Sequence, residues 1–451
     1  MAGGTFDKNI GKVRPGTYIN FESTRQENVA GSSRGTVLLP LAKSDYGPSK
    51  EFITLYNSSP DAAAAKLGYS IYEDDPNDNA LLIREAFKKA STVVLYICAE
   101  NTAAATGTGG GLKGTARYKG TRGNAMKFSV VANPVSGYDV DVYLGANKVE
   151  SFEKVTAAAD LSGSTYIAFE DNGSSGISAA AGVALTDGAD AATCRNSDVT
   201  AFLDAAENVR WNCMAFPFTD GELQTALKAK IKYMRENMGK GVQAVAPSFA
   251  ADYEGIINLT NGYKTESKIL AASEATAYVA AITASATNVQ SNTYTPVDGA
   301  TEVVGLKTHE QAVAAIKAGE VFFSAIENGT VVLEYDINSL VTIVKGKDNT
   351  YKKNRVIRVF DTFAEALQLN FPPNKYDNSP DGWDIMEGIG KTILKQFGPT
   401  ADGGVGAIKN IDYSNDFLVD RERSTGDQTY FNVGLEPVDS AEKLYFTIAT
   451  R

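Results

Sequence analysis

Histidine, a common metal ligand and general base near neutral pH, occurs only once in the sequence, at position 309. Thr308 and Gln311 have the spacing of a capping box, so we expect His309 in the first turn of a helix, where a side chain is usually solvated. There is no second histidine for a metal cluster, and we find no serine or cysteine nucleophile motif to accompany this one. We therefore expect no catalytic residue, no metal and no cofactor.

Two further signatures of chemistry are missing. Cys98, Cys194 and Cys213 have no motif spacing, and the first and last of them lie in apolar runs, so buried and reduced thiols are expected. The glycine-rich run 106–111 lacks the Lys-Ser or Lys-Thr pair that directly follows the last glycine of a phosphate-binding loop. We interpret this run as a flexible linker.

A surplus of basic residues is also absent. Lysine and arginine number 43 against 54 aspartates and glutamates, which gives a formal net charge of −11. Proteins that wrap nucleic acid or adsorb to anionic membranes present an excess of basic side chains, so neither partner is expected. No apolar stretch approaches the length that spans a bilayer, and the first residues lack the pattern of a secretory signal. We therefore expect a protein that is folded in a cytoplasm and does not insert into a membrane.

The sequence does contain the alternation of helix and strand patterns that is typical of an α/β domain. Helical apolar spacing followed by a buried-strand run occurs at 80–90 with 93–98, from 198 with 211–216, and at 219–239 with 242–246. Thr219 and Glu222 have the spacing of a capping box for the third of these helices, and Gly239 marks its end. Helices that alternate with continuously apolar strands indicate a largely parallel sheet covered on both faces.

An interruption of different character separates the first two of these units. Residues 105–193 are rich in glycine, serine, threonine and alanine, and runs such as 126–130 and 138–143 alternate between apolar and polar residues. Short strands at regular spacing indicate a small β-sandwich or barrel. We expect it to be inserted in the α/β region, with the glycine-rich run 106–111 as its hinge.

The second half of the chain adds further elements. Asn328-Gly329 between two apolar runs predicts a hairpin. Other predicted elements are helices near 273–287 and at His309, a strand at 355–360, a helix capped by Thr362 and Glu365, a helix around Trp383 to Leu394, and strands at 429–433 and 444–448. The predicted organisation is an N-terminal arm at 1–30, the first part of the α/β region at 31–104, the sandwich at 105–193, the α/β core at 194–349, an α+β C-terminal domain at 350–438 and a C-terminal strand arm at 439–451.

Both ends of the chain have strand patterns without a local core. Pro15-Gly16 predicts a turn before a short strand at 18–21, and the chain closes on the run 444–448. The backbone groups of such strands must pair with a sheet edge in the same chain or in another. Adding a strand to a neighbour is an established binding mode, and head-to-tail contacts of this kind build rings or helices. Pattern alone leaves both destinations open.

Four segments carry a family resemblance: 11–21 (GKVRPGTYINF), 116–124 (ARYKGTRGN), 354–358 (NRVIR) and 438–445 (VDSAEKLY). They are similar, in this order, to segments of contractile tail sheath proteins from phages of Gram-positive bacteria and from related phage-tail-like bacteriocins. Together they span nearly the whole chain. The resemblance implies an α/β core of subtilisin-like topology without protease activity, an inserted β-sandwich, an α+β C-terminal domain and extended strand arms.

The same resemblance implies a structural role. Subunits of such sheaths stack as six-membered rings around a tail tube, with baseplate and tail terminator proteins as further partners, and contraction drives the tube through a target envelope. Assembly would take place in a bacterial host cytoplasm, and the sequence does not distinguish a phage virion from a headless bacteriocin. The arms would join sheets in the C-terminal domains of neighbours, through side chains that include Val13, Tyr18, Ile19, Phe21, Leu444, Tyr445, Phe446 and Ile448.

One stretch is basic in this acidic protein. Residues 345–358 hold Asp348 as their one acidic residue, against Lys345, Lys347, Lys352, Lys353, Arg355 and Arg358. Our hypothesis is that this basic segment faces an acidic patch on the tube or on a neighbouring subunit, and a solvated loop is the alternative. Two rival functions also stay open at this point: another self-assembling protein, such as a tail tube or surface-layer subunit, and an enzyme with an unrecognised site in the α/β region.

Overall fold

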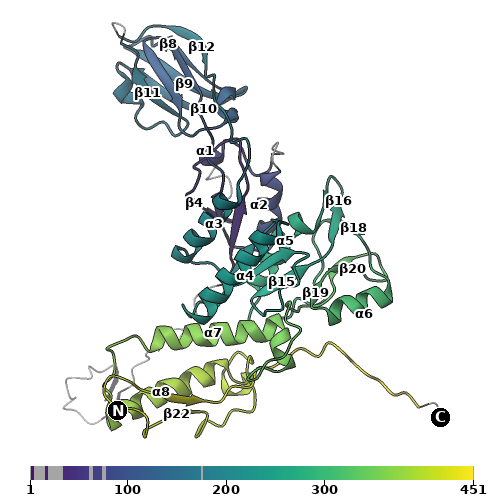
Figure 1. The fold of residues 1–451 in the computed structure, drawn as a ribbon. Helices are drawn as coiled ribbons and strands as arrows, with labels where there is room; N and C mark the ends of the chain where they lie inside the picture. Colours follow the sequence, from purple (N-terminus) through teal and green to yellow (C-terminus); the bar gives the residue numbers. More distant parts are fainter. Residues whose placement is uncertain are drawn as a thin grey trace.

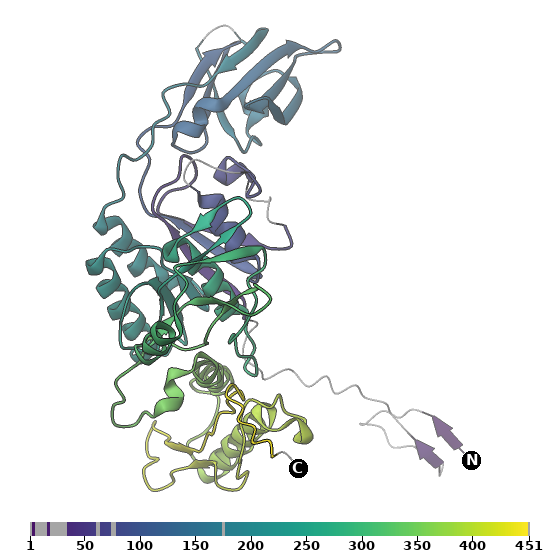
Figure 2. The same cartoon turned by 90° about the vertical axis from the view of Figure 1, so that its right-hand side faces the viewer.

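The computed structural model describes residues 2–4, 16–18, 34–59, 64–73, 78–173 and 176–449. Three bodies follow one another along the molecule: a β-sandwich, an α/β domain and a C-terminal domain (Figures 1 and 2). Near the N-terminus, β1 (Ala2–Gly4) pairs in parallel with β2 (Gly16–Tyr18).

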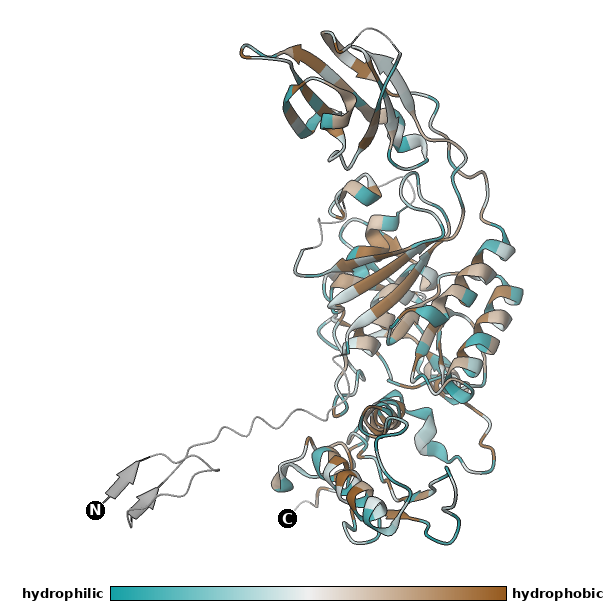
Figure 3. Ribbon diagram, turned by 90° about the vertical axis from the view of Figure 1, so that its left-hand side faces the viewer, coloured by the Kyte–Doolittle hydropathy of each residue, from teal (hydrophilic) through white to brown (hydrophobic). Residues whose placement is uncertain are grey.

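The α/β domain is built on a seven-stranded sheet. Its strand order is β19 (Glu320–Val321), β15 (Ile256–Leu259), β14 (Gln243–Pro247), β13 (Cys213–Ala215), β3 (Thr36–Leu41), β5 (Thr92–Ile97) and β4 (Phe52–Tyr56). Neighbours pair in parallel except for β4, which runs antiparallel to β5. The strands of its centre are continuously apolar (Figure 3), as expected for a sheet buried on both faces.

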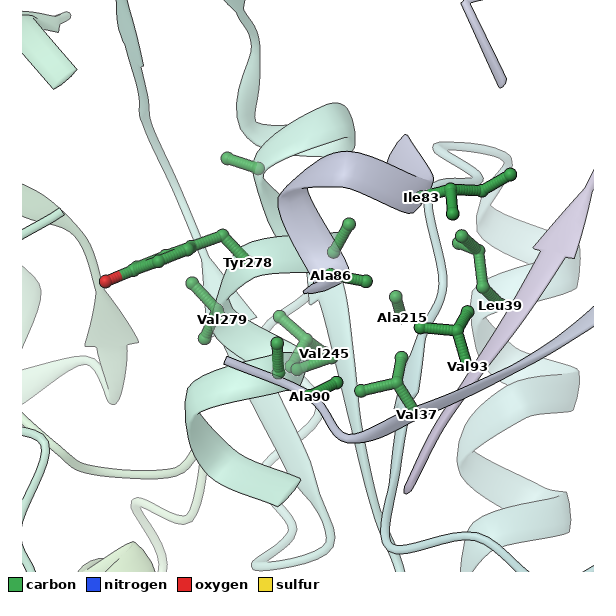
Figure 4. Packing of buried hydrophobic residues seen from close by; sticks show 14 of the residues in the cluster. Val37, Leu39, Ile83, Ala86, Ala90, Val93, Ala215, Val245, Tyr278 and Val279 are labelled. Carbon is green, nitrogen blue, oxygen red and sulfur yellow. The ribbon is translucent and has the colours of Figure 1, made fainter. Parts of the chain in front are cut away.

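Helices cover both faces of this sheet, which confirms the sequence prediction. On one face α2 (Asn79–Phe87) and α5 (Ala272–Ser285) pack together, and Ile83, Ala86 and Tyr278 belong to the same core cluster as Val37 and Val93 of the strands (Figure 4). On the other face lie α3 (Asn196–Ala205) and α4 (Gly221–Glu236). A short helix, α1 (Ala64–Leu67), precedes α2.

The helix starts were predicted with mixed success. The capping box of Thr308 and Gln311 begins α6 (His309–Lys317) as expected, and His309 is exposed. The prediction that Thr219 caps α4 was wrong, because the carboxylate of Asp220 accepts the backbone N–H groups of Glu222 and Leu223, both at 3.0 Å. Aspartate at this position also interacts favourably with the positive end of the helix dipole.

Smaller sheets complete the α/β domain. One has the order β17 (Ile269–Leu270), β16 (Gly262–Thr265) and β18 (Ala300–Val304). The predicted hairpin is present as β20 (Phe323–Ala325) and β21 (Val331–Leu333), joined across Asn328-Gly329. Gly329 has a φ of 82°, a conformation that glycine adopts without strain.

The β-sandwich consists of two antiparallel sheets around a separate apolar core. Their orders are β10 (Asn147–Val155), β9 (Tyr138–Leu144), β8 (Met126–Ala132), β12 (Ala180–Ala184), and β11 (Ile167–Asp171), β7 (Leu112–Ala116), β6 (Thr106–Gly109). The interpretation of 106–111 as a flexible linker was wrong, because this run forms β6 and a two-residue turn into β7. Gly110 and Gly111 both have positive φ, and a Cβ atom on Gly111 would lie 2.2 Å from the carbonyl oxygen of Gly176.

The C-terminal domain packs α7 (Asn354–Asn370) and α8 (Pro380–Phe397) against the two-stranded sheet of β22 (Phe417–Val419) and β23 (Phe431–Val433). The predicted strand at 355–360 was wrong, because these residues form the first turns of α7. Nearly all of that stretch is buried, including Arg355 and Arg358, although Asn354, Arg358 and Asp361 recur in the sequence at the spacing i, i+4, i+7 of one helix face. Thr362 does not cap a helix but lies inside α7, where its hydroxyl donates to the carbonyl oxygen of Arg358 at 2.7 Å.

Candidate functional site

The C-terminal arm presents a group of large apolar side chains to solvent. Figure 1 shows it projecting away from the body of the molecule. The exposed fractions are 67% for Leu444, 90% for Tyr445, 81% for Phe446 and 87% for Ile448. In this single chain residues 444–448 form no strand, in contrast to the sequence prediction, because no sheet edge lies beside them to supply hydrogen bonds. A run of aromatic and apolar side chains this exposed is typical of a binding segment.

The arm is held at its root by a polar contact, which we call the arm clamp: Glu442 with Ser291, Thr293 and Lys353. One carboxylate oxygen of Glu442 accepts the hydroxyl groups of Ser291 at 2.7 Å and Thr293 at 2.8 Å, and the other pairs with the Lys353 ammonium. The side chain of Glu442 is only 9% exposed. The clamp therefore joins the arm to the α/β domain and to the start of α7 at one point.

The clamp changes the acidity of both charged partners. Burial alone would raise the pKa of Glu442, but the hydrogen bonds from Lys353, Ser291 and Thr293 outweigh it and hold that pKa below its ordinary value. Burial would likewise lower the pKa of Lys353, and the hydrogen bond to Glu442 outweighs it and raises that pKa. The Lys353 ammonium also lies 4.1 Å from the centre of the Tyr335 ring. Both groups are thus stabilised in their charged forms.

Two neighbouring contacts extend the clamp along the arm. Asp439 lies 3.9 Å from the Lys353 ammonium, and the Ser440 hydroxyl accepts a hydrogen bond of 2.5 Å from the guanidinium of Arg355. Just before them, the N–H of Val438 donates to the carbonyl oxygen of Ala407 at 2.9 Å. The arm is therefore fixed up to Glu442 and free of the body from Leu444 onward.

The structure breaks up the predicted basic segment. Arg358 is fully buried and pairs with Asp336 at 3.0 Å, Arg355 is buried, and Lys353 belongs to the arm clamp, so all three are engaged in contacts within the chain. Lys353, Arg355 and Arg358 lie at the start of α7, on the side of the helix that faces the α/β domain. Lys347 pairs with Glu254 at 2.5 Å, which leaves Lys345 exposed and Lys352 partly exposed as candidates for an outward-facing patch.

The buried arginine belongs to a polar joint between α7 and the α/β domain that the sequence analysis did not foresee. Arg358 also donates to the carbonyl oxygen of Gln290 at 2.6 Å, and Asn354 donates to the second carboxylate oxygen of Asp336 at 3.0 Å. Further along α7, Asp361 accepts two hydrogen bonds from Arg235 of α4, at 2.7 and 2.9 Å. Paired charges of this kind specify one orientation, because a shifted α7 would leave buried charges without partners.

The C-terminal domain offers a sheet with one open edge. β22 and β23 pair only with each other among the described residues, and in β23 Asn432 and Val433 are exposed while Phe431 is half-buried. The outer side of β22 is covered by α8, where the carboxylate of Glu387 accepts the N–H of Val419 at 3.0 Å. The outer edge of β23 is therefore the one that further strands can join.

The N-terminal candidates are only partly placed. Tyr18 lies in β2, whereas Val13, Ile19 and Phe21 lie outside the described residues.

In the described part of the chain, no three or more His, Cys, Asp or Glu side chains gather in a way that could hold a metal ion. Nor does any described helix combine the length and the apolar character needed to cross a bilayer.

Four family models match the chain and together cover most of it. They are the tail sheath protein Gp18 domain III N-terminal region at 34–96, the phage tail sheath protein beta-sandwich domain at 88–190, the phage tail sheath protein central domain at 192–339 and the phage tail sheath C-terminal domain at 346–451. The first and third of them cover the two parts of the α/β domain, the second covers the inserted β-sandwich and the fourth covers the C-terminal domain.

Relatives and solved structures agree with these matches. The chain is 34% identical to the phage-like element PBSX protein XkdK of Bacillus subtilis, over 99% of each chain. The crystal structure of a sheath tail protein from Desulfitobacterium hafniense has 32% identity and a TM-score of 0.79, over 96% of this chain and 99% of that one. The helical sheath of the anti-feeding prophage in its contracted state shares the fold, with a TM-score of 0.56 at 13% identity over 98% of this chain and 100% of that one. The protein therefore belongs to the phage tail sheath protein family, and it is a structural subunit of a contractile tail sheath.

Proposed function

We propose that the protein polymerises as stacked six-membered rings around a tail tube, and that contraction of the stack drives the tube through a target cell envelope. The single observation that carries this proposal is the C-terminal arm, which is clamped at Glu442 and exposes Leu444, Tyr445, Phe446 and Ile448 beyond it. A segment with this composition gains most free energy by burying its side chains and pairing its backbone in a neighbouring subunit.

The acceptor in our proposal is the sheet of β22 and β23 in a neighbouring subunit. The open edge of β23 supplies backbone partners, and the half-buried Phe431 and exposed Val433 supply apolar contacts. The N-terminal residues Val13, Tyr18, Ile19 and Phe21 would join the same sheet. Each subunit would then be linked to its neighbours by strands from both ends of the chain, which is a head-to-tail contact that propagates.

Contraction in this proposal moves whole subunits without deforming them. The joint of Arg358 with Asp336 and of Arg235 with Asp361 supports a fixed angle between α7 and the α/β domain. The free part of each arm, from Leu444 onward, has no such restraint and acts as the hinge between subunits. Two packings of rigid units joined by flexible links provide the bistability that a contractile polymer requires.

The finer features of the protein are part of the same proposal. Counted along the chain, the strands of the large sheet stand in the order 2-3-1-4-5-6-7, which supports a subtilisin-like topology, although β4 runs antiparallel. We propose no catalytic activity. The further partners would be the tail tube, baseplate and tail terminator proteins, with Lys345 and Lys352 as candidates for contact with the tube. Assembly would take place in a bacterial host cytoplasm.

The experiment compares three versions of the full protein by negative-stain microscopy and sedimentation. The first is the unmodified chain, the second lacks residues 444–451, and the third keeps its length but carries serine at positions 444, 445, 446 and 448. We expect wide-lumen polymers from the first only, since the second and third lack the apolar side chains that bind a neighbour. Val135→Ser, which removes a 77% exposed apolar side chain from the sandwich, is the matched control and should polymerise normally. Normal sheaths from the truncated protein would show that strand exchange through this arm is wrong.

A further inference from the structure

The chain crosses between the α/β domain and the β-sandwich twice, and each crossing carries a cysteine. Cys98 directly follows β5, and Cys194 directly precedes the turn into α3. Between them the two crossing segments run antiparallel, with a bridge that pairs Ala103 with Ala189. Each cysteine stands five residues from this bridge, so the register of the two segments brings the cysteines opposite each other.

The side chains meet as this register predicts. Cys98 is fully buried, and Cys194 is half-buried and packs against the apolar cluster that contains Cys98. The interaction between the two thiols raises the pKa of Cys98 and lowers the pKa of Cys194. The third cysteine, Cys213, is fully buried in β13, and burial raises its pKa to about 12. Cys194 is therefore the reachable and more acidic thiol, and Cys98 is its buried partner.

We propose that Cys98 and Cys194 form an intramolecular disulfide under oxidising conditions, and that this bond staples the base of the β-sandwich. The residues between the two cysteines include every strand of the sandwich, from β6 to β12. The bond would therefore tie together the chain's exit from the α/β domain and its return. Opening of the two crossing segments, which is the local motion that would loosen the sandwich from the core, becomes restricted.

The reaction is thiol–disulfide exchange with a small-molecule disulfide as the oxidant. The Cys194 thiolate attacks one sulfur of that disulfide, whose S–S bond breaks and releases one small thiolate. The Cys98 thiol then loses its proton and attacks the sulfur of Cys194 in the mixed disulfide, which releases the second small thiolate. Two cysteine thiols are oxidised, the small disulfide is reduced to two thiols, and these take up the two protons.

The redox state of the surroundings would decide whether the disulfide forms. A reducing cytoplasm keeps the pair as thiols during assembly, whereas the medium outside a cell favours the disulfide. That change of compartment rests on the proposed function, but formation of the bond does not. The bond would thus restrict movement of the β-sandwich relative to the α/β domain only after the particle is released.

The experiment equilibrates the full protein with mixtures of reduced and oxidised glutathione, followed by acid quenching, alkylation and mass spectrometry. We expect the unmodified protein and Cys213→Ala to lose the mass of two hydrogen atoms and to yield a peptide linked between positions 98 and 194. Cys194→Ser and Cys98→Ala should not lose this mass. If Cys98→Ala does not fold, the unmodified protein and Cys194→Ser still give the comparison.

Two outcomes would overturn the proposal while the protein stays folded. One is a stable glutathione adduct on Cys194 without the linked peptide, which would show that Cys98 does not reach it. The other is three unreacted thiols in the most oxidising mixture. A second measurement is the rate of proteolysis within 99–104 and 189–193, which should fall at least several-fold in the oxidised unmodified protein and stay unchanged in Cys194→Ser.

Discussion

Replacing Glu442 by alanine should release the C-terminal arm from the body of the protein. In the arm clamp this carboxylate accepts hydrogen bonds from Ser291, Thr293 and Lys353, and its side chain is 9% exposed. A hydrogen bond to a charged group contributes about 1.5–3 kcal/mol when it is lost from a buried site. Water reaches all three donors once the arm has left, so we expect less than half of the full sum, about 2–4 kcal/mol.

This free energy sets how often the clamp is open. A cost of about 2–4 kcal/mol corresponds to an increase of about 30- to 900-fold in the open population. The assay is cleavage by trypsin after Lys443, because a protease needs several extended residues on either side of the bond and Glu442 is directly adjacent to it. Cleavage follows the open population when opening is fast. The rate for Glu442→Ala should therefore rise by this factor until it reaches the rate of a free peptide.

The matched control is Glu436→Ala, which removes the same kind of side chain six residues earlier. Glu436 pairs with Lys409 at 3.3 Å, but both side chains are about half exposed, and surface pairs of this kind contribute little. We expect no change in the rate of cleavage after Lys443 in this variant. Equal rates in the unmodified protein and in Glu442→Ala would refute the clamp, because they would mean that other contacts hold the arm.

Two further predictions concern charges. Because the pKa of Glu442 is lowered in the folded protein, the clamp's contribution is present above the unfolded pKa of about 4.3 and is lost as the pH falls through the lower folded value. Hydrogen exchange in 436–449, corrected for its intrinsic pH dependence, should show release of the arm in acid, and Glu442→Gln should remove this dependence. Asp336→Asn leaves the fully buried Arg358 without its counter-ion and should lower the free energy of unfolding by about 3–5 kcal/mol, as measured by urea titration with tryptophan fluorescence. The double variant Asp336→Asn with Arg358→Met should recover much of this loss. A loss in the double variant equal to the sum of the losses in the two single variants would contradict a coupled pair.

Much of the fold could be predicted because its signals are local. The helical spacing of α2, the buried run of β5 and the Asn-Gly turn of the hairpin each need only a short window of sequence, and all three are confirmed. The alternating runs of 105–193 likewise predicted the β-sandwich, which the family comparison confirms.

The errors have different causes. The start of α7 was taken for a strand because 355–360 contains a short apolar run, although Asn354, Arg358 and Asp361 recur at helical spacing. The glycine-rich run at 106–111 was taken for a linker, but Gly111 closes a turn against Gly176, some 65 residues later along the chain, where a side chain would not fit.

The predicted site residues depend on local and on distant contacts to different degrees. The apolar run 444–448 could be found in the sequence, and its residues are exposed in the structure, while their role in binding a neighbour stays a prediction. The basic residues of 345–358 do not form one continuous surface in this chain. Arg358 pairs with Asp336 and Lys353 pairs with Glu442, and these partners lie 22 and 89 positions away in the sequence.

Local periodicity, turn residues and the order of four short motifs were therefore enough to predict many of the elements and the family of this protein. The tertiary structure alone decided which charges are buried, where the arm is held and which thiols meet. The reason is that electrostatic pairing and close packing join residues far apart in the chain, and no pattern within a single segment records its distant partners.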